Sequence, residues 1–339
     1  MGTGFKLAVL LAGLALVSCR SNPGRQVAIA EAYVGPAVLN LRDQLAARAR
    51  VVATVQHGER LEILERRRRF CKVRTAGGVE GWTDGRQLLD EQQMHRLLRL
   101  AERATAFPSQ GKVMPLDLLN VHTEPNRQAP SFFQLEEGEL AEVIAQRVMP
   151  RVPYTGKSPV QKDGPMAANG QPAPSDDWML LRLHDGRAGW VLMRMLAMAI
   201  PEEVGQYAEG HFITSYFSLG EVKTEKGDRS HWLWTTRASP RQSYDFDSFR
   251  VFVFGQRRKR YETAYIERNL KGYYPVTVTR AATETASARY LFRLICQGKD
   301  GALHRRTYEF ADTRVRLLGR EPWQLEFVED IGMRGREEQ

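Results

Sequence analysis

The chain of 339 residues lacks the sequence features that mark most enzymes. It contains no Gly-x-Ser-x-Gly element, no Cys-x-x-Cys pair, no His-Glu-x-x-His helix and no glycine-rich phosphate loop. Its seven histidines are scattered, and no two of them lie at a metal-binding spacing on one expected element. The sequence therefore offers no catalytic residue and no metal ligand, and it implies no cofactor. We expect a protein that binds rather than one that catalyses.

Cysteine is scarce, with three residues at Cys19, Cys71 and Cys296. Cys71 and Cys296 lie in alternating segments of two different expected domains, so we predict two buried thiols rather than a disulfide. A nucleophile made of Cys296 and His304 is the enzyme alternative. It is disfavoured because Cys296 lies inside an expected strand and not at a helix N-terminus, which would lower the pKa of the thiol.

Long apolar runs are absent after residue 17, so no later segment is expected to cross a membrane. Residues 1–18 have a short basic start and an apolar stretch too short to span a bilayer, which indicates a signal peptide. The end of this stretch, Leu16-Val17-Ser18-Cys19, resembles the bacterial lipobox. The resemblance implies lipidation of Cys19, a tether over residues 19–30 and a place in the cell envelope. Arg20 favours the periplasmic face of the outer membrane over the inner membrane, and an ordinary signal peptide with an incidental cysteine is the alternative.

The charge balance is basic, with a formal net charge of +9. Hydrophobic residues make up 42% and charged residues 26% of the chain, which is typical of a folded globular protein. A basic envelope protein is attracted to anionic headgroups or cell-wall carboxylates, although arginines spread over a solvated surface also explain the value. The expected location excludes nucleic acid as a partner.

The sequence contains an internal repeat. The first copy reads Leu39-Asn40-Leu41-Arg42, Gly58-Glu59, Phe70, Gly81-Trp82 and Leu88. The second copy reads Leu119-Asn120-Val121-His122, Gly138-Glu139, Trp178, Gly189-Trp190 and Leu196. The interval from the opening Leu to the Gly-Glu pair is 19 residues in both copies (39 to 58, 119 to 138), and the interval from the aromatic residue to the tryptophan is 12 (70 to 82, 178 to 190). Matching intervals in one order indicate a duplicated unit.

Short alternating segments separated by turn residues predict a mainly β fold. We expect two small β-barrels over residues 31–89 and 112–200, the second with a flexible Pro/Gly-rich insertion at 149–177. A helical linker is predicted at 90–108, capped by Asp90, with Met94, Leu97, Leu98 and Ala101 on its apolar face. Residues 205–330 are predicted to form a separate antiparallel β-domain, either a meander, a sandwich or an open barrel. Residues 331–339 are expected to be a frayed polar tail.

Both copies resemble the bacterial SH3-like domain in the order and spacing of their motifs. The resemblance implies small β-barrels that bind cell-wall peptides or other short peptides, or that act as spacers beside cell-wall hydrolases. The second copy departs from the pattern through its insertion and through Arg194-Met195-Leu196, which lacks the usual polar turn.

The resemblance places two groups of residues beside a ligand groove. The first is the basic run in the loop between the second and third core strands, Arg66, Arg67, Arg68 and Arg69. The second is the set of aromatic candidates Trp82, Trp178 and Trp190. A solvated hairpin tip is the alternative for the arginines, and indoles buried in the barrel cores are the alternative for the tryptophans.

An acidic pair and a second basic cluster are interpreted as parts of turns and not as functional sites. Asp245 and Asp247 are interpreted as a solvated turn, because a glycosidase needs carboxylates held across a cleft. The basic cluster at 257–260 is interpreted as a hairpin tip, with contact to lipid headgroups as the alternative.

Together these features predict a lipid-anchored, non-enzymatic envelope protein that binds cell-wall or protein peptides through its repeated domains. A structural scaffold or spacer subunit of an envelope assembly is the second possibility. A cell-wall hydrolase with its active site within residues 205–330 is the third. The sequence pattern leaves the ligand and the oligomeric state open.

Overall fold

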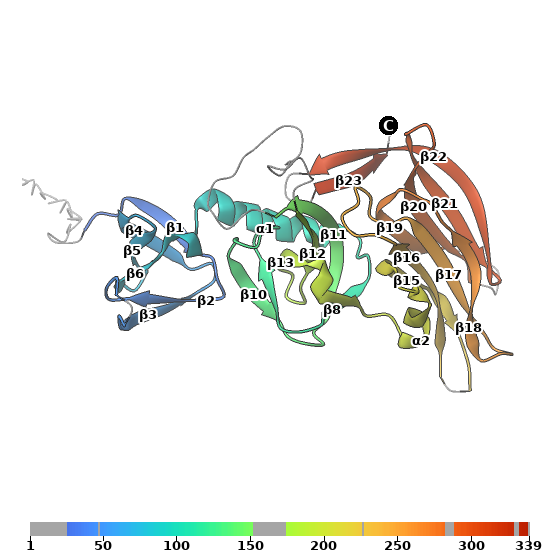
Figure 1. The fold of residues 1–339 in the computed structure, drawn as a ribbon, viewed down its shortest axis with the longest axis horizontal. Helices are drawn as coiled ribbons and strands as arrows, with labels where there is room; N and C mark the ends of the chain where they lie inside the picture. Colours follow the sequence, from blue (N-terminus) through green and yellow to red (C-terminus); the bar gives the residue numbers. More distant parts are fainter. Residues whose placement is uncertain are drawn as a thin grey trace, which may run out of the picture.

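The computed structural model describes residues 26–46, 48–151, 174–225, 227–281, 288–328 and 332–337. The protein is mainly β with antiparallel sheets, as predicted, and it is elongated, with three β-bodies in a row (Figure 1). The expected signal peptide, Cys19 and most of the insertion at 149–177 lie outside the described residues. No described helix is long and apolar enough to cross a membrane.

The first β-body covers residues 30–89 and contains one seven-stranded sheet in the order β3-β2-β6-β5-β4-β1-β7. Its strands are β1 (Ala30–Val34), β2 (Val38–Arg42), β3 (Val51–Gln56), β4 (Arg60–Arg67), β5 (Phe70–Arg74), β6 (Glu80–Asp84) and β7 (Leu88–Leu89). Alternating side chains of these strands fill a small core of their own, including Val34, Leu41, Leu61, Ile63 and Val73.

The second β-body covers residues 112–198 and repeats that strand order as β10-β9-β13-β12-β11-β8-β14. Its strands are β8 (Lys112–Pro115), β9 (Leu119–His122), β10 (Ser131–Leu135), β11 (Ala141–Pro150), β12 (Ser175–Arg182), β13 (Ala188–Leu192) and β14 (Leu196–Met198). Equivalent pairs recur, because Arg42 lies opposite Trp82 and His122 opposite Trp190. A register shift also recurs, in β4 near Leu64 and in β11 near Ile144. The repeat in the sequence thus corresponds to two sheets of one topology.

The glycine of each Gly-Trp pair is required by close packing. A Cβ added at Gly81 would lie 2.8 Å from the Cβ of Leu41, and one added at Gly189 would lie 2.5 Å from a methyl carbon of Val121. Leu41 and Val121 hold the same place in the two opening motifs. Each glycine therefore lets β6 or β13 approach the strand that begins its repeat.

A single helix, α1 (Glu91–Ala106), follows the first β-body. Asp90 caps it by accepting a hydrogen bond from the Gln93 backbone N–H, and the Gln93 side chain accepts one from the Asp90 N–H in return. Its buried residues are Leu97, Leu100 and Ala104, whereas Leu98 is 55% exposed. The predicted apolar face was wrong at Leu98, because the spacing of three and four residues selects the stripe through Leu97, Leu100 and Ala104.

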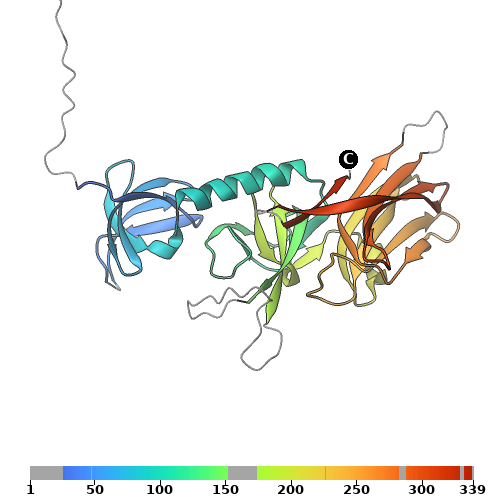
Figure 2. The ribbon, with the colours of Figure 1, turned by 90° about the horizontal axis from the view of Figure 1, so that it is seen from above.

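The helix packs on both neighbouring bodies. It contacts β1 and β7 of the first body and β12 and β13 of the second, and Figure 2 shows it running from the first body along the second. Arg182 holds its C-terminal end, since the guanidinium donates hydrogen bonds to the carbonyl oxygens of Ala104 (2.8 Å), Thr105 and Phe107. Those carbonyls have no partner within the helix, so Arg182 acts as a cap supplied by the second body.

The third β-body covers residues 212–337 and contains two antiparallel meanders, preceded by α2 (Glu202–Gly205). The first has β15 (Phe212–Val222), β16 (Arg229–Arg237), β17 (Ser248–Gly255) and β18 (Arg260–Glu267). The second has β19 (Gly272–Arg280), β20 (Tyr290–Gln297), β21 (Leu303–Ala311), β22 (Arg314–Val328) and β23 (Gly332–Glu337). The predicted frayed tail is therefore wrong over residues 332–337, because this segment pairs along β22 and its backbone groups join the sheet.

Aromatic packing holds the third body together. The Phe292 and Tyr308 rings stack with centroids 5.0 Å apart, and Phe249 meets both rings edge-on. One continuous hydrophobic cluster joins this core to α1 and to the second body. Cys71 and Cys296 are both free and buried, which confirms the prediction for these two thiols.

Candidate functional site

The basic run Arg66–Arg69 covers the end of β4 and the turn of the β4–β5 hairpin in the first body. Arg68 turns the chain with a positive φ of 52°. The Arg67 guanidinium lies over the Trp82 ring, 5.3 Å from its centroid, and that of Arg69 lies over Phe70 at 4.8 Å. The hairpin tip therefore carries two arginines stacked on aromatic rings.

The tryptophans differ in exposure. Trp82 on β6 is partly exposed, and it lies opposite Lys72 of β5. Trp178 and Trp190 are each 1% exposed. The prediction that Trp178 and Trp190 contact a ligand is corrected by this burial, because the second body shares its core with α1 and the third body and encloses both indoles. Of the three tryptophans, Trp82 is the one that is not fully buried.

A cleft of about 810 Å³ lies between the first and second bodies. Its walls come from the strand edges of the first body, the start of α1 and the loop that precedes β10. The charged side chains along it are Glu31, Arg66, Arg86, Asp90, Glu124 and Arg127. We refer to this space as the inter-body cleft.

Most cations of the inter-body cleft are already paired. Arg86 binds Asp84 at 2.7 Å, and Arg127 binds Asp176 with both ends of its guanidinium at 2.7 Å. The Arg66 side chain has no ion pair or hydrogen bond within the described part of the chain. It is therefore the cation of the cleft that remains available to an acidic ligand.

The Cys71 thiol also lines the inter-body cleft. Burial raises its pKa above the ordinary value, so the thiol stays protonated at neutral pH and is a poor nucleophile. Its position is better explained by packing in the first core.

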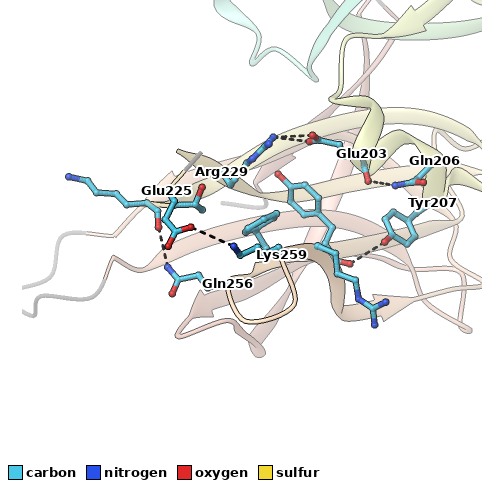
Figure 3. Close-up of a pocket in the computed structure, with 12 residues that line it drawn as sticks. Glu203, Gln206, Tyr207, Glu225, Arg229, Gln256 and Lys259 are labelled. Atoms are coloured by element: carbon cyan, nitrogen blue, oxygen red, sulfur yellow. Dashed lines mark hydrogen bonds and ion pairs between the residues drawn. The ribbon is translucent and has the colours of Figure 1, made fainter. Parts of the chain in front are cut away.

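A second hollow, of about 640 Å³, lies at one end of the third body beside α2 (Figure 3). Several of its polar groups pair with one another. Arg229 binds Glu203 at 2.9 Å and Lys259 lies 3.5 Å from Glu225, while the Tyr207 hydroxyl donates to the Tyr261 carbonyl oxygen at 3.1 Å. These contacts satisfy five of the polar side chains that line the hollow. The basic cluster at 257–260 lies in the β17–β18 hairpin, which agrees with its interpretation as a hairpin tip.

Cys296 and His304 face each other across β20 and β21, as direct register partners. Cys296 is fully buried, and burial raises the pKa of its thiol to about 12. A thiol with this pKa is almost wholly protonated at neutral pH, so the pair does not resemble an activated nucleophile. Within the described residues, no group of His, Cys, Asp and Glu is arranged to hold a metal ion.

Sequence reasoning missed the contribution of residues outside the motifs. The loop of the second body supplies Glu124 and Arg127 to the inter-body cleft, which no local pattern indicates. Asp245, interpreted as part of a solvated turn, is instead enclosed between the second and third bodies. Its buried neighbours come from other strands, so its environment has no signal in the adjacent sequence.

Comparison with known proteins gives one informative match. Aligned solved structures include NlpC2 from Trichomonas vaginalis, at 9% identity, covering 73% of this chain and 99% of that chain with a TM-score of 0.17. NlpC1 from the same organism aligns at 10% identity over 94% and 98% of the two chains, also with a TM-score of 0.17, and similarity at this level carries no functional argument. No curated protein sequence matches the chain. Residues 37–88, within the first body, match the bacterial SH3 domain family.

Proposed function

We propose that this chain is a lipid-anchored, non-enzymatic protein of the cell envelope that binds cell-wall or protein peptides. Its two SH3-like domains, at 31–89 and 112–200, form the binding unit, and Cys19 carries the lipid on the periplasmic face of the outer membrane. The family match at residues 37–88 supports association with the cell wall. The identical strand order of the two sheets supports a second SH3-like copy.

The observation that carries the proposal is the inter-body cleft with its uncommitted Arg66. A cleft of about 810 Å³ has room for several residues of an extended peptide. Arg66 supplies a planar donor for a carboxylate. Trp82, with Arg67 stacked on it, provides an aromatic surface on the same body.

The absence of catalysis is supported by the state of the candidate nucleophile. Cys296 lies in the core with a raised pKa, and a hydrolase needs a nucleophile that substrate can reach. The scaffold alternative is favoured by a different observation, the continuous hydrophobic cluster through α1 and the second and third bodies. Such packing would hold these parts at a fixed spacing.

Sedimentation of the full chain with purified cell-wall sacculi tests the proposal. We expect the chain to pellet with sacculi and Arg66→Gln to weaken retention about tenfold, since a charge-assisted hydrogen bond contributes about 1.5–3 kcal/mol. Arg68→Gln is the matched control, because Arg68 lies at the hairpin tip and outside the inter-body cleft. Failure of the wild-type chain to pellet would contradict the binding role and favour the scaffold.

A further inference from the structure

The hollow beside α2 is built from three segments that come together at one end of the third body. The segments are α2 with the turn that follows it, the β15–β16 hairpin and the β17–β18 hairpin. The volume of about 640 Å³ falls within the range of about 300–1,000 Å³ that is typical of small-molecule sites. We call this space the α2 hollow, and Figure 3 shows the side chains that line it.

Contacts between the three segments hold the α2 hollow in shape. The Gln256 amide nitrogen donates a hydrogen bond to the Lys223 carbonyl oxygen at 3.2 Å and so joins the two hairpins. The ion pair of Arg229 with Glu203 joins the β15–β16 hairpin to α2. Tyr261 of the lining belongs to a small buried cluster of the third body, so part of the lining rests on a core. The hollow is therefore largely preformed, as binding sites usually are.

Two cations of the lining keep donors that a ligand can reach. Arg229 is 32% exposed, and its Nη1 binds Glu203, while its Nε and Nη2 have no hydrogen bond in the described part of the chain. Lys259 is 69% exposed, and its Nζ has a loose contact of 3.5 Å with the Glu225 carboxylate. Arg229 belongs to the β15–β16 hairpin and Lys259 to the β17–β18 hairpin, so the donors come from two sides of the α2 hollow (Figure 3).

Acceptors line the same hollow. Glu225 is 90% exposed, and its carboxylate has the loose contact with Lys259. Gln206 and Gln256 each donate from the amide nitrogen to a backbone carbonyl oxygen, at 2.9 and 3.2 Å, and their amide oxygens have no partner among the described residues. Free donors and free acceptors therefore occur together. Hydroxyl groups, which both donate and accept, satisfy such a mixture.

Aromatic rings supply the apolar part of the lining. Phe254 and Tyr207 line the α2 hollow and are partly exposed. The Arg229 guanidinium lies 5.8 Å from the centroid of Phe254, so a hydroxyl group bound by Arg229 comes close to this ring. A sugar ring packs its C–H groups against an aromatic ring, because these groups carry partial positive charge and the aromatic face is negative. Exposed rings beside mixed donors and acceptors therefore favour a sugar.

The charge of the lining favours a sugar that is acidic. The lining carries four cations and two carboxylates, which leaves a net charge of +2: Lys223, Arg229, Lys259, Arg260, Glu203 and Glu225. Glu262, outside the lining, does not cancel this excess, because its carboxylate contacts both Arg258 and Arg260. A net positive hollow attracts a negatively charged group.

We propose that the α2 hollow binds an acidic sugar, a pyranose that carries a carboxylate, within a short oligosaccharide. Lys259 binds the carboxylate, Arg229 and the two glutamine amide oxygens bind hydroxyl groups, and Phe254 packs against the ring carbons. A volume of about 640 Å³ has room for a disaccharide. The site lies in the third body, so the inference does not rest on the function proposed for the inter-body cleft.

Isothermal titration calorimetry on the full chain tests the inference with a matched pair of disaccharides. Cellobiouronic acid and cellobiose differ in one group, a carboxylate in place of a CH₂OH group. We expect the acid to bind about fivefold more tightly than cellobiose, which is the effect of one partly exposed ion pair. Lys259→Gln should reduce binding of the acid to the level of cellobiose. Arg257→Gln, in the same hairpin turn but outside the lining, is the matched charge control and should leave both affinities unchanged.

A second variant measures the contact with the sugar ring. Phe254→Leu should weaken the acid and cellobiose by a similar several-fold factor, because it removes the aromatic face and keeps an apolar side chain. Lys259 is 69% exposed, so its replacement leaves the fold intact. Absence of acid binding at millimolar concentration, equal binding of the acid and cellobiose, or acid binding unchanged in Lys259→Gln would each overturn the inference.

Discussion

Replacing Asp245 by Asn should stabilise the protein, and the gain should grow with pH. Burial raises the pKa of the Asp245 carboxyl from 3.8 to about 6. Asp245 keeps some exposed surface, but its carboxyl is enclosed between the second and third bodies. The positive charge of Arg237 lowers the pKa of this carboxyl, but by less than the loss of solvent raises it. The folded protein therefore favours the protonated form.

The sign of the pH dependence follows from this shift. Below pH 3.8 both the folded and the unfolded chain hold the proton, and the carboxyl costs no stability. Between 3.8 and about 6 the folded chain holds a proton that the unfolded chain has lost, so stability falls as pH rises. Above about 6 the full cost is present. One pKa unit corresponds to about 1.4 kcal/mol, which gives a total of about 3 kcal/mol.

Asparagine removes the charge and keeps an oxygen for the Tyr274 N–H, which lies 2.7 Å from the carboxylate. We expect Asp245→Asn to increase the free energy of unfolding by about 1 kcal/mol at pH 4.5 and by about 3 kcal/mol at pH 8. Urea unfolding of both proteins at the two pH values measures this, and groups common to both proteins cancel in the difference. A gain that is the same at both pH values, or a loss of stability at pH 8, would refute the reasoning.

Three further predictions concern packing and thiol reactivity. Leu100→Ala should lower the free energy of unfolding by about 2–4 kcal/mol, because Leu100 is 3% exposed and joins α1 to the main cluster. Leu98→Ala should change the free energy of unfolding by less than about 1 kcal/mol, because Leu98 is exposed. Urea unfolding of both variants measures the difference. Gly189→Ala should destabilise the second body by about 2 kcal/mol or more, since its Cβ would lie 2.5 Å from Val121 and 2.6 Å from Phe132; a thermal unfolding midpoint equal to that of wild type would contradict this. Cys296 should resist alkylation by iodoacetamide at pH 8 in the folded chain and react in urea, because its pKa is about 12; mass spectrometry of the labelled peptide distinguishes the two cases.

The local architecture of the first two bodies could be predicted from the sequence. The Gly-Trp pairs and the opening motifs mark strands that touch, because glycine is needed where β6 meets Leu41 and β13 meets Val121. The helix start at Asp90 was also predictable, since capping depends on neighbouring residues. These features depend on local chemistry and local spacing.

Features that depend on packing between bodies could not be predicted. Trp82 and Trp190 occupy equivalent places in the repeat, yet only Trp190 is buried, because the second body shares a core with α1 and the third body. Gln146 and Asp245 are 99 residues apart, and no periodicity relates them. The strand at 332–337 is polar in sequence and forms because β22 offers a free edge for its backbone.

The separation of the hydrophobic clusters has a consequence for how the chain unfolds. The small core of the first body is one cluster, α1, the second body and most of the third body share another, and a third, small cluster lies within the third body. A region with its own core can lose structure by itself, whereas regions that share a core unfold together. Denaturation should therefore proceed in two stages, with residues 30–89 melting first and the remainder as one cooperative unit. Since the inter-body cleft needs both the first and the second body, its binding capacity should vanish in the first stage.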